Sequence, residues 1–367
     1  ILGGRPPFSF FYLLYSFLKI DVIRLNYLIK RGGKKMKVID MHCDTIMAIY
    51  NAQKQGKQIE LKNSDLNISV DKMEKGDYLA QCFAMFVPLA RVDNAFETVN
   101  EMIDVFYTEL EKNQDRLALA LNYDDIIKNQ KEGKMSAVLT IEEGGTTKAN
   151  LHFLRNLYRL GVRMITLTWN YENGIGFPNI DRGQDGEIDT TIPNTKDGLT
   201  PEGIAMVQEM ERLGMIIDVS HLSDAGFYDV LKYTTKPFVA SHSNARGQCN
   251  HVRNMTDDMI KKFAARGCVM GINYAADFLE VPPTDKTGFM STVDNMVKHI
   301  QYIKNLVGID YIGLGSDFDG ISQNLEMKDC SMLPMLENKM REAGFSDEEI
   351  EKVFYKNVLR VFKEVLK

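Results

Sequence analysis

The sequence predicts a (β/α)8 TIM barrel with a binuclear metal site at the C-terminal face of its strands. Eight short apolar runs are spread along the chain, and segments with helical patterns separate them. Most runs end in a residue that can bind a metal, move a proton or hold a ligand. Near-continuous apolar strands that alternate with helices are typical of a parallel sheet covered by helices, and eight units favour closure into a barrel.

The predicted strands span 38–42, 82–87, 137–143, 164–169, 215–221, 238–242, 269–274 and 311–317. Helices are predicted to begin at capping residues, namely Thr200, Ser223, Thr256, Ser291 and Ser346. The last of these opens a stretch with capping-box spacing, Ser346 to Glu349, before the final amphipathic helix. No glycine-rich turn of the dinucleotide-binding or Walker type is present, which argues against a nucleotide-binding sheet.

The first 35 residues differ from the remainder, and we predict a single barrel domain over 36–367. Residues 8–18 are apolar but too few to span a membrane, and a basic segment, 31–35, precedes Met36. We interpret 1–35 as a non-native or disordered extension, with Met36 as the true start. A poor signal sequence or surface anchor is the alternative.

Composition indicates an ordinary globular protein whose partner is a small molecule. Hydrophobic residues make up 44% of the chain, charged residues 26%, and the net charge is −6. This balance offers no basic stripe for nucleic acid, and no membrane partner is expected. The five scattered cysteines show no C-x-x-C spacing, which argues against disulfides and thiolate zinc sites and favours a cytoplasmic location.

His42 and Asp44 are the sharpest local signal for a metal, because residues two apart on a strand point to the same side. Other predicted strands end at Glu143, His221 and His242. Either histidine alone could be a buried imidazole satisfied by a backbone carbonyl. Together the five side chains exceed the usual ligand number of one catalytic zinc, so we expect two Zn²⁺ ions, with Glu143 central enough to bridge them.

Asp317 ends the eighth predicted strand and is the expected general acid and base. Asp319 competes for that role, although the following glycine suggests that it belongs to a turn. Arg253 carries a planar fork suited to a substrate carboxylate, with an ordinary surface arginine as the alternative. The irregular stretch 170–200 follows the fourth strand and is predicted to build the substrate pocket rather than a solvated insertion.

These residues, in this order, resemble the membrane dipeptidase family, also called renal dipeptidase, over essentially 36–367. The resemblance rests on seven motifs: Asp40-Met-His42-Cys-Asp44, Glu143-Gly-Gly145, Gly198-Leu-Thr-Pro through Leu213-Gly-Met-Ile-Ile-Asp-Val-Ser-His221, Ser241-His242-Ser-Asn, Arg253-Asn254, Gly315-Ser-Asp317-Phe-Asp-Gly320 and Asn357-Val-Leu-Arg360-Val. It implies a metal-dependent amidohydrolase-like barrel.

The resemblance implies that one zinc binds His42 and Asp44, and that the other binds His221 and His242. The family pattern places the bridging acid directly before the Gly-Gly pair, which selects Glu143 over Glu142. Alternation along the strand is then expected to turn Glu142 away from the metals.

The resemblance also implies that Arg253 holds the C-terminal carboxylate of a dipeptide and that Asp317 works near the metal-bound water and the substrate amine. Trp169 is a departure, because better-known animal members have a histidine there that helps to stabilise the tetrahedral intermediate. An indole donates one hydrogen bond and carries no proton-dependent charge. The family further suggests a homodimer.

The sequence therefore predicts a zinc-dependent dipeptidase in which a metal-bridging hydroxide attacks the peptide bond, including dipeptides that end in a D-amino acid. Asp317 and Glu143 are the predicted catalytic residues, and Arg253, Trp169 and Asn170 the predicted substrate-binding residues. A related dizinc barrel hydrolase that acts on another amide, a cyclic amide or an N-acyl amino acid is the alternative. A catalytically silent metal-binding or ligand-binding protein is the alternative from another class.

Overall fold

A computed structural model describes residues 36–182, 188–283, 288–321 and 324–367. The predicted extension, 1–35, lies outside the described residues, as do 183–187 within the predicted pocket loop. Contacts divide the chain into two compact units, Ile1–Met36 and Lys37–Lys367. Everything that follows concerns the second unit.

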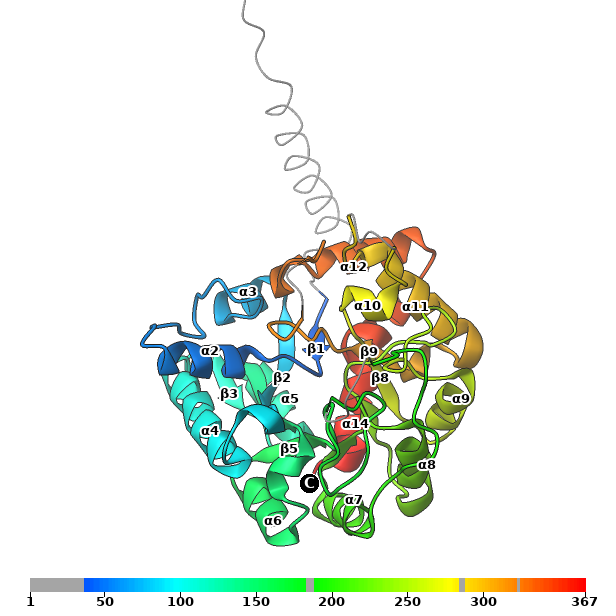
Figure 1. The fold of residues 1–367 in the computed structure, drawn as a ribbon. Helices are drawn as coiled ribbons and strands as arrows, with labels where there is room; N and C mark the ends of the chain where they lie inside the picture. The colour runs from blue at the N-terminus through cyan, green and yellow to red at the C-terminus, as the bar shows by residue number, and fades with distance from the viewer. Residues whose placement is uncertain (1–35, 183–187, 284–287, 322–323) are drawn as a thin grey trace, which may run out of the picture. The chain divides into compact units, whose positions relative to one another are not determined.

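Eight parallel strands of the described chain form a closed barrel, which confirms the predicted fold (Figure 1). The hydrogen-bonded order is β2-β1-β9-β8-β7-β6-β5-β4, and a further pairing of β2 with β4 closes the ring. These strands are β1 (Val38–Asp40), β2 (Tyr78–Phe86), β4 (Met135–Glu142), β5 (Val162–Thr166), β6 (Ile216–Asp218), β7 (Val239–Ala240), β8 (Val269–Ile272) and β9 (Ile312–Leu314).

Each of the eight predicted strands has a counterpart in the barrel, although several observed strands end earlier than the apolar runs do. The polar residues at the ends of those runs lie beyond the ladder, in the turns that follow the strands. One short strand, β3 (Leu117–Leu119), was not predicted; it pairs with the first three residues of β4. Because these polar residues lie in turns, the end of the barrel that carries the site is built from turns as much as from strands.

The helices surround the ring of strands, except that α14 lies across the middle of the ring in this view (Figure 1). They are α2 (Thr45–Lys54), α3 (Val70–Lys75), α4 (Ala95–Lys112), α5 (Tyr123–Lys131), α6 (Leu151–Arg159), α7 (Pro201–Leu213), α8 (Asp224–Tyr233), α9 (Asp257–Ala265), α10 (Ala276–Leu279), α11 (Val293–Val307), α12 (Pro334–Glu342), α13 (Asp347–Glu351) and α14 (Asn357–Val365). In the described chain, no helix has the length and apolar character that crossing a bilayer requires.

The predicted helix starts are largely confirmed, because side chains satisfy backbone N–H groups that the first turn leaves unpaired. Thr200 accepts from Gly203 at the start of α7, and Ser223 accepts from Gly226 at the start of α8. Ser346 and Glu349 form the predicted capping box. At α11 the cap is Thr292, one residue after the predicted Ser291.

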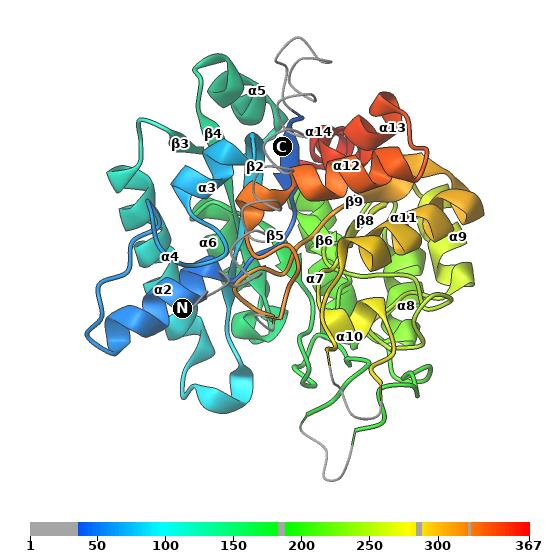
Figure 2. The same cartoon turned by 90° about the horizontal axis from the view of Figure 1, so that it is seen from above.

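The C-terminal helix α14 fills one end of the barrel. Its residues Val358, Val361 and Phe362 belong to the same buried cluster as Met41 and Val138 of the strand region. Figure 2 shows α14 at one end of the molecule, with α10 and the loop after β5 towards the opposite end. One end of the barrel is thus an apolar core, which leaves the other end for polar groups.

All five cysteines are buried and unpaired.

Candidate metal centre

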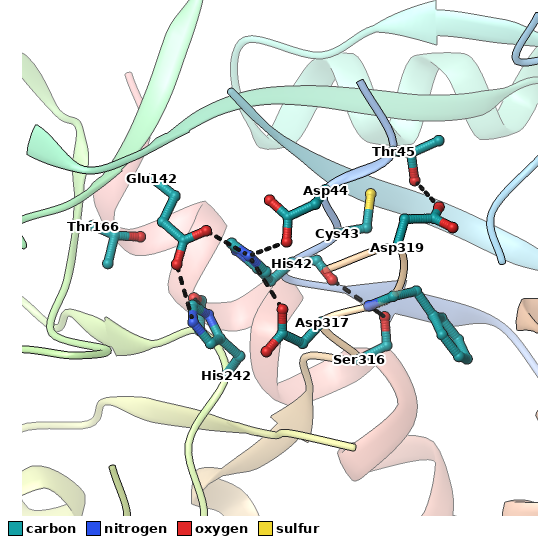
Figure 3. Close-up of polar contacts among 12 residues, drawn as sticks. His42, Cys43, Asp44, Thr45, Glu142, Thr166, His242, Ser316, Asp317 and Asp319 are labelled. Carbon is teal, nitrogen blue, oxygen red and sulfur yellow. Dashed lines mark hydrogen bonds and ion pairs between the residues drawn. The ribbon is translucent and has the colours of Figure 1, made fainter. Parts of the chain in front are cut away.

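Six ionisable side chains converge where β1, β4, β6, β7 and β9 end: His42, Asp44, Glu142, His221, His242 and Asp317. Figure 3 labels all of these except His221 and shows them pointing toward one another. Two groups among them bring ligand atoms within 4.8 Å of one another, His42 with Glu142 and His242, and His42 with Asp44 and Asp317. Side chains at the C-terminal ends of barrel strands point into a shared space, which is why residues far apart in the sequence meet here.

The carboxylate of Glu142 lies at the centre of this cluster. Its Oε2 atom is 3.3 Å from Nε2 of His42. Its Oε1 atom is 3.1 Å from Nε2 of His221 and 3.6 Å from Nε2 of His242. Each oxygen therefore faces a different set of imidazoles, the arrangement that a carboxylate needs to bridge two cations.

The sequence-based choice between the two adjacent glutamates is corrected by the structure. Glu142 is the last residue of β4. It lies four residues after Val138, on the same face of the strand, and Val138 packs in the barrel core. Glu143 is no longer extended: its φ is 86°, and its carboxylate accepts from the backbone N–H groups of Gly145 and Trp169. Alternation along β4 therefore places Glu142 on the interior face with Val138, and the turn at Glu143 directs the second carboxylate away from the histidines.

Period-two spacing counted from Val138 would have selected Glu142. All eight residues of β4 are buried, however, so polarity along the strand does not distinguish the residues that face the barrel interior from those that face the helices. This ambiguity is inherent to parallel strands covered on both sides.

Asp317 lies beside the second group, with Oδ1 3.9 Å from Nε2 of His42. Its Oδ2 atom accepts a 2.8 Å hydrogen bond from Nδ2 of Asn273, on the turn after β8. The backbone of Asp317 is left-handed, with φ 62°, and His221 is likewise left-handed, with φ 69°. Non-glycine residues adopt this conformation at an energetic cost, which the surrounding contacts must offset.

Asp319 plays the turn role that the sequence allowed for it. Its carboxylate accepts from the Thr45 hydroxyl at 2.6 Å and from the Asn67 backbone N–H at 2.7 Å. Figure 3 shows it on the side of the cluster away from Glu142 and His242. It ties the β9 turn to α2 and leaves Asp317 as the acid beside the histidines.

Burial shapes the acid–base properties of the cluster. It raises the pKa of Glu142 to about 8 and that of Asp317 to about 6, although His42 lowers both. Burial alone would lower the pKa of His42, but Glu142 and Asp44 raise it well above its ordinary value. Nearby cations would restore the ionised state of these carboxyl groups.

The residues fit a bound metal ion by an independent criterion. Nε2 of His42 and Oδ1 of Asp44 are buried and have no hydrogen-bond partner in the described part of the chain. Buried polar atoms are normally paired, so two unpaired ligand atoms aimed into a cluster of acids and imidazoles suit a coordinated cation. Imidazole and carboxylate donors favour a borderline ion such as zinc.

Arg253 is buried at 4% exposure and lies behind His242, whose carbonyl oxygen it contacts through Nη2 at 3.2 Å. Its Nε atom has no hydrogen-bond partner in the part of the chain that the structure describes. Burial lowers the pKa of this guanidinium to about 10, while Asp317 and Glu142 raise it. It is a charged core residue with a spare donor, and the surface alternative is wrong.

Trp169 packs in an aromatic wall beside the cluster. Its ring centroid is 4.9 Å from that of Phe86, 5.5 Å from that of Tyr171 and 6.2 Å from that of His221. Asn170, which was predicted to contact the substrate, has a different partner here: its Oδ1 atom lies 2.9 Å from Nδ1 of His221. Because an amide oxygen can only accept a hydrogen bond, His221 carries its hydrogen on Nδ1, and its Nε2 atom has none.

A parallel barrel with buried clusters of histidine, glutamate and aspartate at its strand ends defines a metal-dependent hydrolase. The family model described as membrane dipeptidase, peptidase family M19, matches residues 29–367. The chain therefore belongs to that family and is a metallo-dipeptidase.

Individual relatives agree with the family match. The chain is 29% identical to dipeptidase tcpJ of Claviceps purpurea over 330 residues, which cover 87% of this chain and 74% of that protein. Among solved structures, dipeptidase AC, a metallopeptidase of the same family, has a TM-score of 0.80 at 23% identity, covering 91% of this chain and 99% of that one.

A second solved structure is a metallopeptidase from Rhodobacter sphaeroides that was crystallised with a phosphinate mimic of the dipeptide L-Ala-D-Ala. It has a TM-score of 0.78 at 22% identity and covers 90% of this chain and 100% of that chain. At this identity the two solved structures establish a shared fold.

Proposed function

We propose that this chain hydrolyses the peptide bond of dipeptides, including dipeptides that end in a D-amino acid, with the help of two zinc ions. One ion would be held by His42 and Asp44, the other by His221 and His242, with Glu142 shared between them. The observation that carries this proposal is the position of Glu142, whose two oxygens face two different groups of imidazoles.

Bound zinc would supply an activated water and polarise the carbonyl under attack. The protein's own part begins with Asp317. Its Oδ2 atom is held by Asn273, while Oδ1 faces the cluster. A carboxylate held in this position can accept a proton and return it. We assign to Asp317 the transfer of a proton from the attacking water to the leaving amine.

Arg253 is the candidate for binding the C-terminal carboxylate of the dipeptide. It lies directly behind His242, and its spare Nε donor can contribute to a charge-assisted hydrogen bond. A ligand of this class is plausible on independent grounds, because the Rhodobacter sphaeroides metallopeptidase was crystallised with a mimic of L-Ala-D-Ala.

The alternative substrate class, another amide or an N-acyl amino acid, is favoured by Trp169. The aromatic wall formed by Phe86, Trp169 and Tyr171 offers apolar surface beside His221. An apolar acyl group would bury surface against this wall, whereas the free amine of a dipeptide would gain little there.

The test is metal analysis of the purified protein, followed by a screen of L,L-dipeptides, L,D-dipeptides and N-acyl amino acids. We expect two zinc ions per chain and chelator-sensitive hydrolysis of dipeptides. Faster turnover of N-acyl amino acids than of dipeptides would favour the alternative function, hydrolysis of N-acyl amino acids. A protein that binds no metal and cleaves none of these compounds would contradict both.

Two adjacent substitutions test the ligand set. Glu142→Gln should abolish binding of the metal pair and hydrolysis, because an amide cannot bridge two cations as a carboxylate does. Glu143→Gln is the matched control: it should keep both metals while destabilising the fold by about 1–3 kcal/mol through its disrupted hydrogen bonds. Loss of metal in the Glu143 variant with retention in the Glu142 variant would refute the assignment.

A further inference from the structure

We propose that Asp218 is a positioning residue of the metal centre, and that it acts through the hydroxyl of Ser241. It would hold the ring of His242 in the form that carries hydrogen on Nδ1 and presents a bare Nε2 to the metal. This inference rests on the metal assignment proposed above, and extends it from the ligands to the groups that orient them.

Asp218 is the last residue of β6 and is completely buried. Its Oδ1 atom accepts from the backbone N–H groups of Ser220 at 3.0 Å and Ser241 at 2.8 Å. Its Oδ2 atom accepts from the hydroxyls of Thr166 at 2.6 Å and Ser241 at 2.5 Å. Four donors converge on one carboxylate, an arrangement that suits a group acting only as an acceptor.

The Ser241 hydroxyl connects this carboxylate to the metal centre. Its Oγ atom lies 2.5 Å from Oδ2 of Asp218 and 2.7 Å from Nδ1 of His242. A hydroxyl has one hydrogen to donate, and an ionised carboxylate can only accept, so that hydrogen goes to Asp218. Oγ must then accept from His242, which places the imidazole hydrogen on Nδ1 and leaves Nε2 without one.

The consequence appears on the other side of the two rings. Asn170 imposes the same form on His221, so both Nε2 atoms present lone pairs, and they lie only 3.0 Å apart. Oε1 of Glu142 lies 3.1 Å from one of them and 3.6 Å from the other. Two Nε2 lone pairs at this distance repel one another unless a cation lies between them and Glu142.

The carbonyl oxygen of Ser241 lies close to two glycines of neighbouring segments. A Cβ on Gly271 or Gly315 would collide with the carbonyl oxygen of Ser241. Glycine at both positions lets β8 and the β9 turn close against the residue that precedes His242. The hydroxyl of Ser241 is thereby held between Asp218 and the imidazole.

A purely structural role for Asp218 is the competing explanation, because its contacts also join β5, β6 and β7. A positioning role and a purely structural role of Asp218 predict different effects of substitutions at Ser241 and Thr166. Both hydroxyls donate to Oδ2 of Asp218, but of the two only Ser241 also contacts His242. Thr166→Val is therefore a matched control for Ser241→Ala, since each removes one buried hydroxyl from the same carboxylate.

The experiment titrates the metal-free full chain with Zn²⁺ by calorimetry, for the wild type and three variants. Ser241→Ala should weaken one of two binding events roughly 10- to 100-fold and leave the other unchanged. Asp218→Asn should weaken the same event at least as much, because an amide nitrogen can reverse the direction of the Ser241 hydrogen bond. Thr166→Val should bind both ions like the wild type.

A second measurement needs no metal. In metal-free protein with ¹⁵N-labelled histidine at about pH 8, the His242 signals should report hydrogen on Nδ1 in the wild type and in Thr166→Val. Asp218→Asn should move that hydrogen to Nε2. If Asp218→Asn fails to fold, the comparison of Ser241→Ala with Thr166→Val still decides the question.

Equal metal binding by Ser241→Ala and Thr166→Val, with hydrogen on Nε2 of His242 in the wild type, would overturn the proposal for Asp218. A wild-type protein that binds no Zn²⁺ would instead overturn the proposed function, while the imidazole signals would still test the orientation of His242. The two failures are therefore distinguishable.

Discussion

Adjacent residues at the end of β4 have separate tasks. Glu142 faces His42, His221 and His242, whereas Glu143 turns back to accept from Gly145 and Trp169. Burial raises the pKa of both carboxyl groups, to about 8 and about 7. The same side chain one position apart thus lies either among the histidines or in a loop anchor, and the local backbone conformation decides which.

Gly320 is predicted to be essential for metal binding, although its own atoms bind nothing. A Cβ at this position would collide with Oδ2 of Asp44 and crowd Oδ1 of Asp317. Gly320→Ala should therefore lower zinc content and dipeptide hydrolysis together while the protein remains folded, as judged by metal analysis and circular dichroism. In Gly56→Ala the Cβ would meet open space, although the backbone φ of 73° strains an alanine there. This variant should lose some stability but keep its zinc, and an equal loss of zinc there would refute the explanation.

Arg253→Lys should raise KM for dipeptides by about 10- to 100-fold and change kcat much less. Lysine keeps the charge but loses the planar fork, so the carboxylate of the substrate forms fewer hydrogen bonds. Steady-state kinetics with a dipeptide and with the matching dipeptide amide would check this prediction. The amide has no carboxylate, so an equal effect of the substitution on both substrates would argue against this role for Arg253.

At the scale of elements, the turn after β4 and the loop after β5 are joined close to the metal centre. Asn173 donates to Oε1 of Glu143 and to the carbonyl oxygen of Leu167, and Trp169 donates to Oε2 of Glu143. The same loop carries Asn170, which orients His221. One polar network therefore holds both the aromatic wall and the imidazole of His221 in place.

Helices α6 and α7 are joined outside the barrel by Glu209, which accepts from Nε of Arg155 and Nε of Arg212, both at 2.6 Å. The hydrogen bonds from Arg212 and Arg155 lower the pKa of Glu209 to about 2, against the opposing effect of burial. A carboxyl pKa that is lower in the folded state stabilises the protein above the unfolded pKa of about 4.3, and this contribution is lost as the pH falls towards 2.

Glu209→Gln should accordingly reduce the free energy of unfolding by about 1 kcal/mol at pH 7, and by progressively less below about pH 4. Urea unfolding of both proteins across this pH range would measure the difference. Glu111→Gln, a change at an exposed position of α4, is the control and should have little effect at any pH. A difference for Glu209→Gln that stays constant down to pH 3 would contradict the pKa argument.

At the scale of the whole molecule, the barrel has one apolar and one polar end. Helix α14 packs against the strand core at the first, and the metal centre joins the turns after β1, β4, β6, β7 and β9 at the second. Ions bound at such a junction stabilise the folded state, because the unfolded chain does not hold these ligands together.

Removal of metal should therefore lower the unfolding temperature, by on the order of 10 °C for tightly bound ions. Differential scanning calorimetry with and without a chelator, followed by addition of Zn²⁺, would measure the loss and its recovery. Glu142→Gln should show little response to either treatment. A wild-type protein whose unfolding temperature does not respond to the chelator would contradict a stabilising metal pair.

The barrel could be predicted from the sequence because each of its eight strands is a local apolar run and most helix starts have a local cap. Strand β3 was missed because it is only three residues long. The convergence of His42, Asp44, His221 and His242 was also predictable, since strand ends in a parallel barrel share one face. The contact of Asn170 with His221 was not, because it joins residues 51 positions apart through a side chain in an irregular loop.

By itself, the sequence determined the fold class, the family and the residue types of the centre, because these depend on local pattern and chain order. The tertiary structure decided which glutamate lies among the histidines, since β4 is buried on both faces and only the left-handed turn at Glu143 shows where alternation stops. It also revealed Asp218 and Ser241 behind His242, because a hydrogen-bond relay depends on distances and directions that no linear pattern records.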